Sequence, residues 1–440
     1  MLLRNLLAIT LPMTMVAISV VNTQAQDWLR FRGNDGSGVS TESATTATEF
    51  GLEKNLAWKI DLPGAGASAP VIVGDKIFLT CYSGYGMTRN NPGKMENLKR
   101  HVVCYNKKTG DKIWQKDLES VQPEDPFSGM GVPEHGYASG TPVSDGKHLF
   151  TFFGKTGVIA FDLDGNQIWK KSVGTASGRM RWGSGASPVL HGDVLVVNAS
   201  DEDNSLVGLN KSNGEQVWKN SDIQNVWGTP LVVGKGDKAT LVFSIPSEVW
   251  GLNPKNGKLK WYATNGIPDS SVSTSPVAKQ DVVIAMGGRS GTAVAIRTGG
   301  KADVTKSHTV WEGKSTVKII SPVIVGDYLF GFDRGIAACV KADSGESVFR
   351  ERLPAEPNAS SGGSGRRGAS SDYCSPVAAD GKIYQFTKKG TCYVLEAKPE
   401  FKVLAINSLN DGSEFNSTPA ISEGKIYVRS NKRLYCITAK

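Results

Sequence analysis

The phrase IAFDLDGNQIWK (residues 159–170) decides the fold because it returns along the chain. Further copies are VVCYNKKTGDKIWQK (102–116), VGLNKSNGEQVWKN (207–220) and WGLNPKNGKLKWYA (250–263). In each copy a small residue comes first, a turn containing glycine follows, and a tryptophan stands after the turn. A phrase that recurs at a regular spacing marks a unit of architecture.

A second phrase precedes the first in each unit and contains serine, threonine or alanine followed by proline. Its prolines stand at positions 70, 142, 188, 230, 276, 322, 376 and 419. The short apolar runs after each proline alternate with polar residues and end at Gly, Asp or Asn, which is typical of strands and tight turns. Four short strands per repeat form one blade of a propeller. The sequence therefore predicts an all-β fold, an eight-bladed β-propeller of four-stranded antiparallel blades.

The tryptophan after each turn is predicted to stand on the outer strand of its blade and to fill the space against the neighbouring blade. A small residue such as Ala160 leaves room for the strand that packs over it. A buried tryptophan hides roughly 150–250 Å², a gross gain of about 4–6 kcal/mol before entropy is subtracted. These structural staples are Trp58, Trp114, Trp169, Trp218, Trp261 and Trp311, with Phe349 in the sixth copy and Leu404 in the seventh.

The ring is predicted to close through its N-terminal strand. The eighth copy stops after its third strand, at RLYCITAK (433–440), whereas NLAWKIDL (55–62) carries Trp58 in the tryptophan position. Residues 55–62 would therefore complete the last blade, and a closed ring has no exposed sheet edge to manage.

The first 25 residues are interpreted as a secretory signal peptide. Arg4 precedes a mostly apolar stretch, and Thr23-Gln24-Ala25 has the small-x-small pattern of a cleavage site. The alternative is an uncleaved membrane anchor, but polar residues interrupt the apolar run, and about twenty apolar residues are needed to span a bilayer. We therefore expect an exported chain, periplasmic or secreted, whose propeller domain covers residues 26–440 without a further transmembrane segment.

Charge and cysteine content restrict the expected partners. The chain has 440 residues and a net charge of +8, but its basic residues are scattered, so nucleic acid is not an expected partner. Six cysteines occur without a CxxC pair. Three of them (Cys104, Cys339 and Cys436) occupy the small position of the first phrase and are predicted to be buried filling. Whether any cysteine pair forms a disulfide stays open.

Several stretches resemble a known group of exported propellers. The repeat resembles the pyrroloquinoline-quinone (PQQ) repeat propellers, a superfamily that includes the quinoprotein dehydrogenases and the BamB-type propellers. Resemblance to its exported members from environmental bacteria is carried by DWLRFRGNDGSGVS (27–40), EHGYASGTPV (134–143) and SDYCSPVAADGKIY (371–384). The resemblance implies the fold over about residues 27–440. The adjacent cysteines and the haem motif of quinoprotein alcohol dehydrogenases are absent, as is the lipidated cysteine of BamB-type lipoproteins.

Long loops are predicted to gather on the top face of the propeller, where the second-to-third and blade-to-blade loops meet. They cover residues 83–99, 115–137 and 356–372. A flat ligand stacked on tryptophan, with arginines taking its carboxylates, would suit the residues on this face. The alternative is that the same residues plug the top of the channel. The candidate ligand-binding residues are His135, Arg179, Arg181, Trp182, Trp227, Arg289, Asp333, Arg334 and Tyr373.

No catalytic or metal site is predicted. SDEDNS (200–205) lacks the glycine and the distant glutamate of a calcium loop and is interpreted as a solvated hairpin tip. The favoured function is a monomeric scaffold that binds a protein or a small molecule through its top face. One alternative is a PQQ- and Ca²⁺-dependent oxidoreductase of alcohols or sugars, and a second is a carbohydrate-binding propeller.

Overall fold

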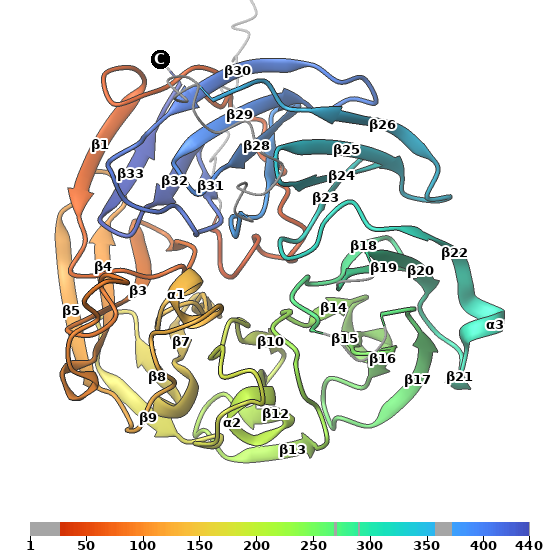
Figure 1. Cartoon of the computed structure of the whole chain (residues 1–440). Coiled ribbons are helices and arrows are strands. Elements are labelled where there is room, and N and C mark those ends of the chain that lie inside the picture. The colour runs from red at the N-terminus through yellow and green to blue at the C-terminus, as the bar shows by residue number, and fades with distance from the viewer. Residues whose placement is uncertain (1–26, 268–270, 289–290, 357–371, 440) are drawn as a thin grey trace, which may run out of the picture.

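The computed structural model describes residues 27–267, 271–288, 291–356 and 372–439. Eight antiparallel sheets are arranged around a central axis in chain order (Figure 1). The predicted eight-bladed propeller is confirmed. The expected signal peptide (residues 1–25) lies outside the described residues.

The first four blades have their strands in sequence order from the axis outward. Blade 1 has β2 (Val71–Val73), β3 (Lys76–Ser83), β4 (Lys99–Asn106) and β5 (Lys112–Glu119). Blade 2 has β6 (Val143–Ser144), β7 (His148–Phe152), β8 (Val158–Asp162) and β9 (Gln167–Lys171). Blade 3 has β10 (Val189–His191), β11 (Val194–Ala199), β12 (Ser205–Asn210) and β13 (Gln216–Asn220). Blade 4 has β14 (Leu231–Val233), β15 (Thr240–Ile245), β16 (Glu248–Leu252) and β17 (Leu259–Thr264), and the short β21 (Ala302–Asp303) pairs parallel to β17.

Blades 5 to 7 repeat this order, whereas the outermost strand of blade 8 is the N-terminal β1. Blade 5 has β18 (Val277–Lys279), β19 (Val282–Gly287), β20 (Thr292–Arg297) and β22 (Thr309–Lys314). Blade 6 has β23 (Val323–Val325), β24 (Tyr328–Asp333), β25 (Ile336–Lys341) and β26 (Ser347–Arg352). Blade 7 has β27 (Val377–Ala379), β28 (Lys382–Phe386), β29 (Thr391–Glu396) and β30 (Val403–Ser408). Blade 8 has β31 (Ala420–Ser422), β32 (Lys425–Arg429), β33 (Arg433–Ile437) and β1 (Leu56–Asp61).

The helices are single turns within loops. The described residues contain the α-helices α1 (Val132–His135), α2 (Ser200–Asp203) and α3 (Thr305–His308). They also contain the 3₁₀ turns η1 (Met95–Asn97), η2 (Gly154–Thr156) and η3 (Gly236–Lys238). Both α1 and α2 lie near the top of the propeller and carry residues of the site described below.

Trp218 shows why the repeated phrase has its spacing. It stands opposite Gly208 in the sheet, and a Cβ atom on Gly208 would come within 2.2 Å of the indole. The ring reaches the next blade, where Nε1 donates to the carbonyl of Pro254 at 3.1 Å. There Gly257 has a φ of +69°, and its missing Cβ leaves room for the same ring. The small residue, the turn glycine and the tryptophan therefore belong to one contact between two blades.

The same contact recurs around the ring. The indole Nε1 atoms of Trp114, Trp169 and Trp311 donate to carbonyls in the next blade, at 3.1, 2.9 and 3.0 Å. Trp58 packs in the same way against Gly110 of blade 1. Trp261 is fully buried, but its Nε1 has no partner among the described residues. Its neighbour differs because β21 replaces the tight turn and pairs with the strand of Trp261.

The seventh blade corrects one expectation. Ala405, not Leu404, stands opposite Val394 in the position that tryptophan occupies elsewhere. Leu404 is the bulge residue one position earlier, equivalent to Val217 before Trp218. The prediction of Leu404 was wrong because the turn of this copy is irregular. Counting residues from the turn therefore placed the strand one residue out of register.

Closure by the N-terminal strand is confirmed. Strand β1 pairs antiparallel with β33, and Trp58 stands opposite Cys436 (Figure 1). A second link across the same joint is the fully buried Arg429, which donates to the carbonyls of Thr80 and Gly64. All six cysteines are buried and free.

We predict that Trp218→Ala lowers the free energy of unfolding by about 3–5 kcal/mol, the usual cost of truncating a buried tryptophan. Thermal and denaturant unfolding would measure it. The matched control is Val217→Ala, because Val217 is 49% exposed and its truncation is expected to change stability by less than about 0.5 kcal/mol. Equal losses in the two variants would contradict the assigned role of the indole.

Candidate functional site: a cavity on the propeller axis

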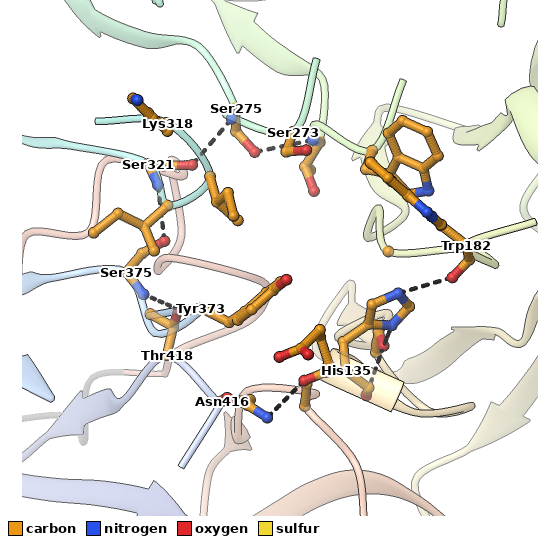
Figure 2. Close-up of a pocket in the computed structure, with 18 of the residues that line it drawn as sticks. His135, Trp182, Ser273, Ser275, Lys318, Ser321, Tyr373, Ser375, Asn416 and Thr418 are labelled. Carbon is orange, nitrogen blue, oxygen red and sulfur yellow. Dashed lines mark hydrogen bonds between the residues drawn. The ribbon is translucent and has the colours of Figure 1, made fainter. Parts of the chain in front are cut away.

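A cavity of about 540 Å³ lies on the axis of the propeller. Its walls come mainly from the loops that lead from one blade into the inner strand of the next, with smaller contributions from second-to-third loops at Gly288 and Arg334. These two loop types share one face of an antiparallel blade. The cavity is therefore lined by loops of the face that was expected to carry function, and Figure 2 shows its lining residues in close-up.

A ring of hydrogen bonds surrounds the cavity and ties neighbouring blades together. The residue before each proline donates its backbone N–H to the hydroxyl of the equivalent residue in the next blade. The donor–acceptor pairs are Ala69–Thr141, Thr141–Ser187, Ser187–Thr229, Thr229–Ser275, Ser275–Ser321, Ser321–Ser375 and Ser375–Thr418, at 2.9–3.1 Å. Figure 2 shows the last members of this hydroxyl ring. It is interrupted at Ala69, which has no hydroxyl.

The hydroxyl ring also gives the cavity its hydrogen-bonding character. All seven hydroxyl residues line the cavity, and each oxygen already accepts one backbone N–H. Within the described part of the chain, none of these hydroxyl protons has an acceptor. A hydroxyl can donate while it accepts, so the ring offers a ligand a circle of free donors.

The cavity is also lined by the N-terminal segment (residues 27–40), which crosses the centre of the ring (Figure 1). Phe31 lines the cavity. The next residue, Arg32, is 1% exposed and donates to the carbonyls of Ser321 and Pro322. Burial lowers the pKa of Arg32 to about 9. The sequence did not predict this plug, since nothing in residues 27–40 shows that they turn into the channel.

Two tryptophans form one wall of the cavity. The rings of Trp182 and Trp227 lie 4.9 Å apart at 41° to each other. Trp227 is 9% exposed, and its Nε1 donates to the carbonyl of Gly183 at 2.7 Å. Trp182 is more exposed than Trp227, so its indole is the surface that a ligand would meet.

His135 fixes this wall to helix α1. Its Nε2 lies 3.0 Å from the carbonyl oxygen of Trp182, which can only accept, so Nε2 carries the proton. Its Nδ1 then accepts from the Ser139 hydroxyl at 2.5 Å. Burial lowers the pKa of His135, although the hydrogen bond to Trp182 opposes the shift. The neutral imidazole therefore acts as a structural link within the wall.

Of the described residues that line the cavity, one carries a carboxylate, and it is already paired. Glu134 forms ion pairs with Lys388, at 2.6 Å, and with Arg89. Burial raises the pKa of Glu134, but the two ion pairs outweigh burial and leave it below its ordinary value. Two further cations, Lys318 and Arg334, are exposed at the rim. The lining is therefore slightly positive.

The structure brings together five of the nine predicted ligand-binding residues: His135, Trp182, Trp227, Arg334 and Tyr373 all line the cavity. Arg179, Arg181 and Asp333 do not line it, and Nε of Arg181 lies 3.8 Å from Oδ1 of Asp125. Arg289 lies outside the described residues. Ligand binding by any of them stays a prediction.

The expected solvated tip at residues 200–205 is wrong. Residues 200–203 form α2, and the side chains of Asp201 and Glu202 are buried, each 4% exposed. Burial first, and Asp125 second, raise the pKa of Asp201 to about 7. Burial and the neighbouring Asp201 raise the pKa of Glu202 to about 8. A run of acids normally indicates solvent exposure, so composition alone could not reveal the loop that covers them.

The hydroxyl ring was also missed, although its signal is in the sequence. The residue before proline is serine or threonine in seven of the eight copies. Because the period of the repeat places these residues at the same height on the axis, a ring of hydroxyls could have been predicted from them. The described residues contain no group of three or more His, Cys, Asp or Glu side chains placed to hold a metal ion. Among them, no helix is long and apolar enough to cross a membrane.

Comparisons with known proteins agree with the fold. A family profile described as outer membrane protein assembly factor BamB matches residues 98–351. Similar solved structures include BamB from Moraxella catarrhalis, at 13% identity and a TM-score of 0.60, covering 87% of this chain and 99% of that one. Quinohemoprotein alcohol dehydrogenase from Comamonas testosteroni matches at 9% identity and a TM-score of 0.63, covering 93% of this chain and 80% of that one. The computationally designed protein Ika8 matches at 10% identity and a TM-score of 0.54, covering 86% of this chain and 98% of that one. No curated protein matches.

We predict that Ser321→Ala destabilises the propeller by about 1–3 kcal/mol, because it leaves the backbone N–H of Ser275 buried without an acceptor. Thermal unfolding would measure the loss. The matched control is Ser273→Ala, which removes a hydroxyl from the same cavity wall but not from the ring. A stability of Ser321→Ala equal to that of the control would contradict the structural role of the ring.

Proposed function

This chain belongs to the family described as outer membrane protein assembly factor BamB, and from this premise we propose that it is an exported binding propeller whose axial cavity holds a carbohydrate. The proposal includes the export expected from residues 1–25. Carbohydrate binding was one of the alternatives that the sequence left open, and we assign it to the axial cavity.

The observation that carries the proposal is the combination of the hydroxyl ring with the tryptophan wall. Sugar hydroxyls both donate and accept, and the free protons of the ring residues would be donors to them. The face of Trp182 offers a flat apolar surface to the C–H groups of a sugar ring, with Trp227 packed against it. A volume of about 540 Å³ lies within the range of small-molecule sites, roughly 300–1,000 Å³.

The residues present do not fit the PQQ and Ca²⁺ pair of a quinoprotein dehydrogenase. Calcium takes six to eight oxygen ligands, several of them carboxylates. Among the described residues, one carboxylate lines the cavity, that of Glu134, and it is neutralised by Lys388 and Arg89. The amide oxygen of Asn416 is free of partners among the described residues, but a single amide beside a paired carboxylate is not a calcium site. We therefore derive no redox step for this cavity.

A second candidate function is protein binding through the same face, as the family's description suggests. Three exposed methionines favour it: Met87 (47% exposed), Met130 (67%) and Met180 (38%). They lie on the loops that also carry Arg89, Glu134 and Trp182. Methionine is adaptable and common at surfaces that accommodate varied partners. A protein seated on these loops would cover the mouth of the cavity.

We predict saturable binding of a mono- or disaccharide, measured by calorimetry and by quenching of tryptophan fluorescence with a panel of sugars and with PQQ. Trp182→Ala is expected to weaken binding about tenfold, or about 1.4 kcal/mol, because it removes the stacking surface. Arg181→Ala is the matched control, since Arg181 is adjacent in sequence but lies outside the cavity, and its affinity should equal that of the wild type. Absence of binding by every sugar at millimolar concentration, or tight one-to-one binding of PQQ, would contradict the proposal.

A further inference from the structure

The three residues at the tryptophan wall are each held by a different contact. The carbonyl of Trp182 accepts from His135, and the carbonyl of Gly183 accepts from Trp227. The hydroxyl of Ser184 donates to Oε1 of Glu202. These residues, 182–184, are called the wall segment. Its third contact connects the axial cavity to the buried acids of helix α2.

The carboxyl groups of Asp201 and Glu202 have more buried oxygens than hydrogen-bond partners. Oδ2 of Asp201 and Oε2 of Glu202 are buried without a hydrogen-bond partner among the described residues. Asp125 and Glu124 lie in the same region and are also buried. An unpaired carboxylate is costly in such surroundings unless it takes up a proton.

The charged groups around this pair come from every element packed against α2. Lys155 of η2 lies 3.7 Å from Asp125, and Arg100 of β4 is bound to Glu124, so each nearby buried cation is already paired. The loop that covers α2 adds Arg181, whose side chain is 64% exposed and lies near Asp125. On α2 itself, Asp203 is paired with Lys219 at 2.6 Å. Lys155 opposes the raised pKa of Asp201, but no described cation forms an ion pair with Asp201 or Glu202.

The loop lies directly on the acids, and the cavity beside Glu202 and Ser184 has a volume of about 20 Å³, room for about one water. A Cβ on Gly174 would come within 2.2 Å of the carbonyl oxygen of Glu202, and one on Gly178 within 2.2 Å of Oδ1 of Asp201. Ala176 donates its N–H to the same Glu202 carbonyl at 3.0 Å. If the pair ionises, hydration by more than about one water requires this loop to move. The loop continues directly into the wall segment.

We propose that the Asp201–Glu202 carboxyl pair is a proton-controlled latch on the axial cavity: the loop that covers the pair and continues into the wall segment stays closed over the neutral carboxyls and opens when they ionise and need hydration. The Ser184–Glu202 hydrogen bond by itself favours the ionised form, so the opening is driven by burial of the pair against this bond. The latch rests on the contacts above. Only its consequence, that opening weakens carbohydrate binding by displacing Trp182, rests on the proposed function.

The sign of the pH dependence follows from the raised pKa values. Burial raises the pKa of Asp201 to about 7 and that of Glu202 to about 8, whereas both groups titrate near pH 4 in the unfolded chain. Between these limits the folded state holds more protons than the unfolded state. The stability contributed by the pair is therefore complete below about pH 4 and is lost as the pH rises through about 7 to 8.

Amide hydrogen exchange of the loop over the acids (residues 174–184) tests the latch without any ligand, because the N–H groups of Ala176 and Arg181 in this loop are hydrogen-bonded at 3.0 and 2.9 Å. We expect exchange in the wild type, corrected for its intrinsic pH dependence, to become about tenfold faster between pH 6 and pH 9. Asp201→Asn/Glu202→Gln cannot ionise and should exchange slowly throughout, whereas Asp203→Asn, the control on the same helix, should behave as the wild type. Flat exchange in the wild type would overturn the proposal, even if the double variant does not fold.

A sugar titration over the same pH range separates the two hypotheses. If the wall segment opens with rising pH and sugar affinity falls about tenfold in parallel, the latch acts on the cavity. If the segment opens but no sugar binds at any pH, the latch is supported and the carbohydrate proposal is wrong. If a sugar binds equally at both ends of the range and exchange is flat, the latch is overturned while the binding site stands.

Discussion

The interlock between each outer-strand tryptophan and the glycine turn of the next blade is the constraint on which the rest of the structure depends. Each blade is a small sheet that could not bury its faces alone, so its stability comes from its neighbours. The indole of Trp169 fills the space under Gly214 and donates to the carbonyl of Lys211, and so fixes both the distance and the rotation between two blades. Repeated around the ring, this contact leaves little freedom in the angle at which the chain closes.

The hydroxyl ring makes a matching contact at the axis. Inner strands converge there, and the backbone N–H of the residue before each proline points at a neighbouring blade, where a buried donor needs an acceptor. Serine and threonine provide it without adding bulk. Tryptophans on the outside and hydroxyls on the inside therefore hold the blades at two radii. The loops between these two rings do not hold the blades together, so their sequences can vary. Binding residues concentrate on such loops of a rigid scaffold.

The fold could be predicted from the sequence because the repeat occurs eight times. Closure could be predicted because the last copy lacks its outer strand, whereas residues 55–62 carry Trp58 in the matching position. The site was harder. Residues His135, Trp182 and Tyr373 were found because they flank the second phrase, which the period of the repeat places at one height. Arg181 was misplaced because position in a loop does not fix the direction of a side chain. Burial of Asp201 and Glu202 could not be foreseen, since it depends on a loop that covers them from the neighbouring connection.

The departures from good packing are informative about the cavity. Among the described residues, Asp201 and Glu202 are the acids that keep a buried oxygen without a partner, and both lie directly behind the tryptophan wall. A stable ring does not need them there, because α2 is a single turn at the tip of a hairpin and could have carried neutral residues. Local costs of this kind persist where the surrounding structure is rigid enough to impose them, and they concentrate at functional sites. The wall built on Trp182 is therefore the part of the cavity in which a change of state would cost the propeller least, since neither the tryptophan staples nor the hydroxyl ring would have to move.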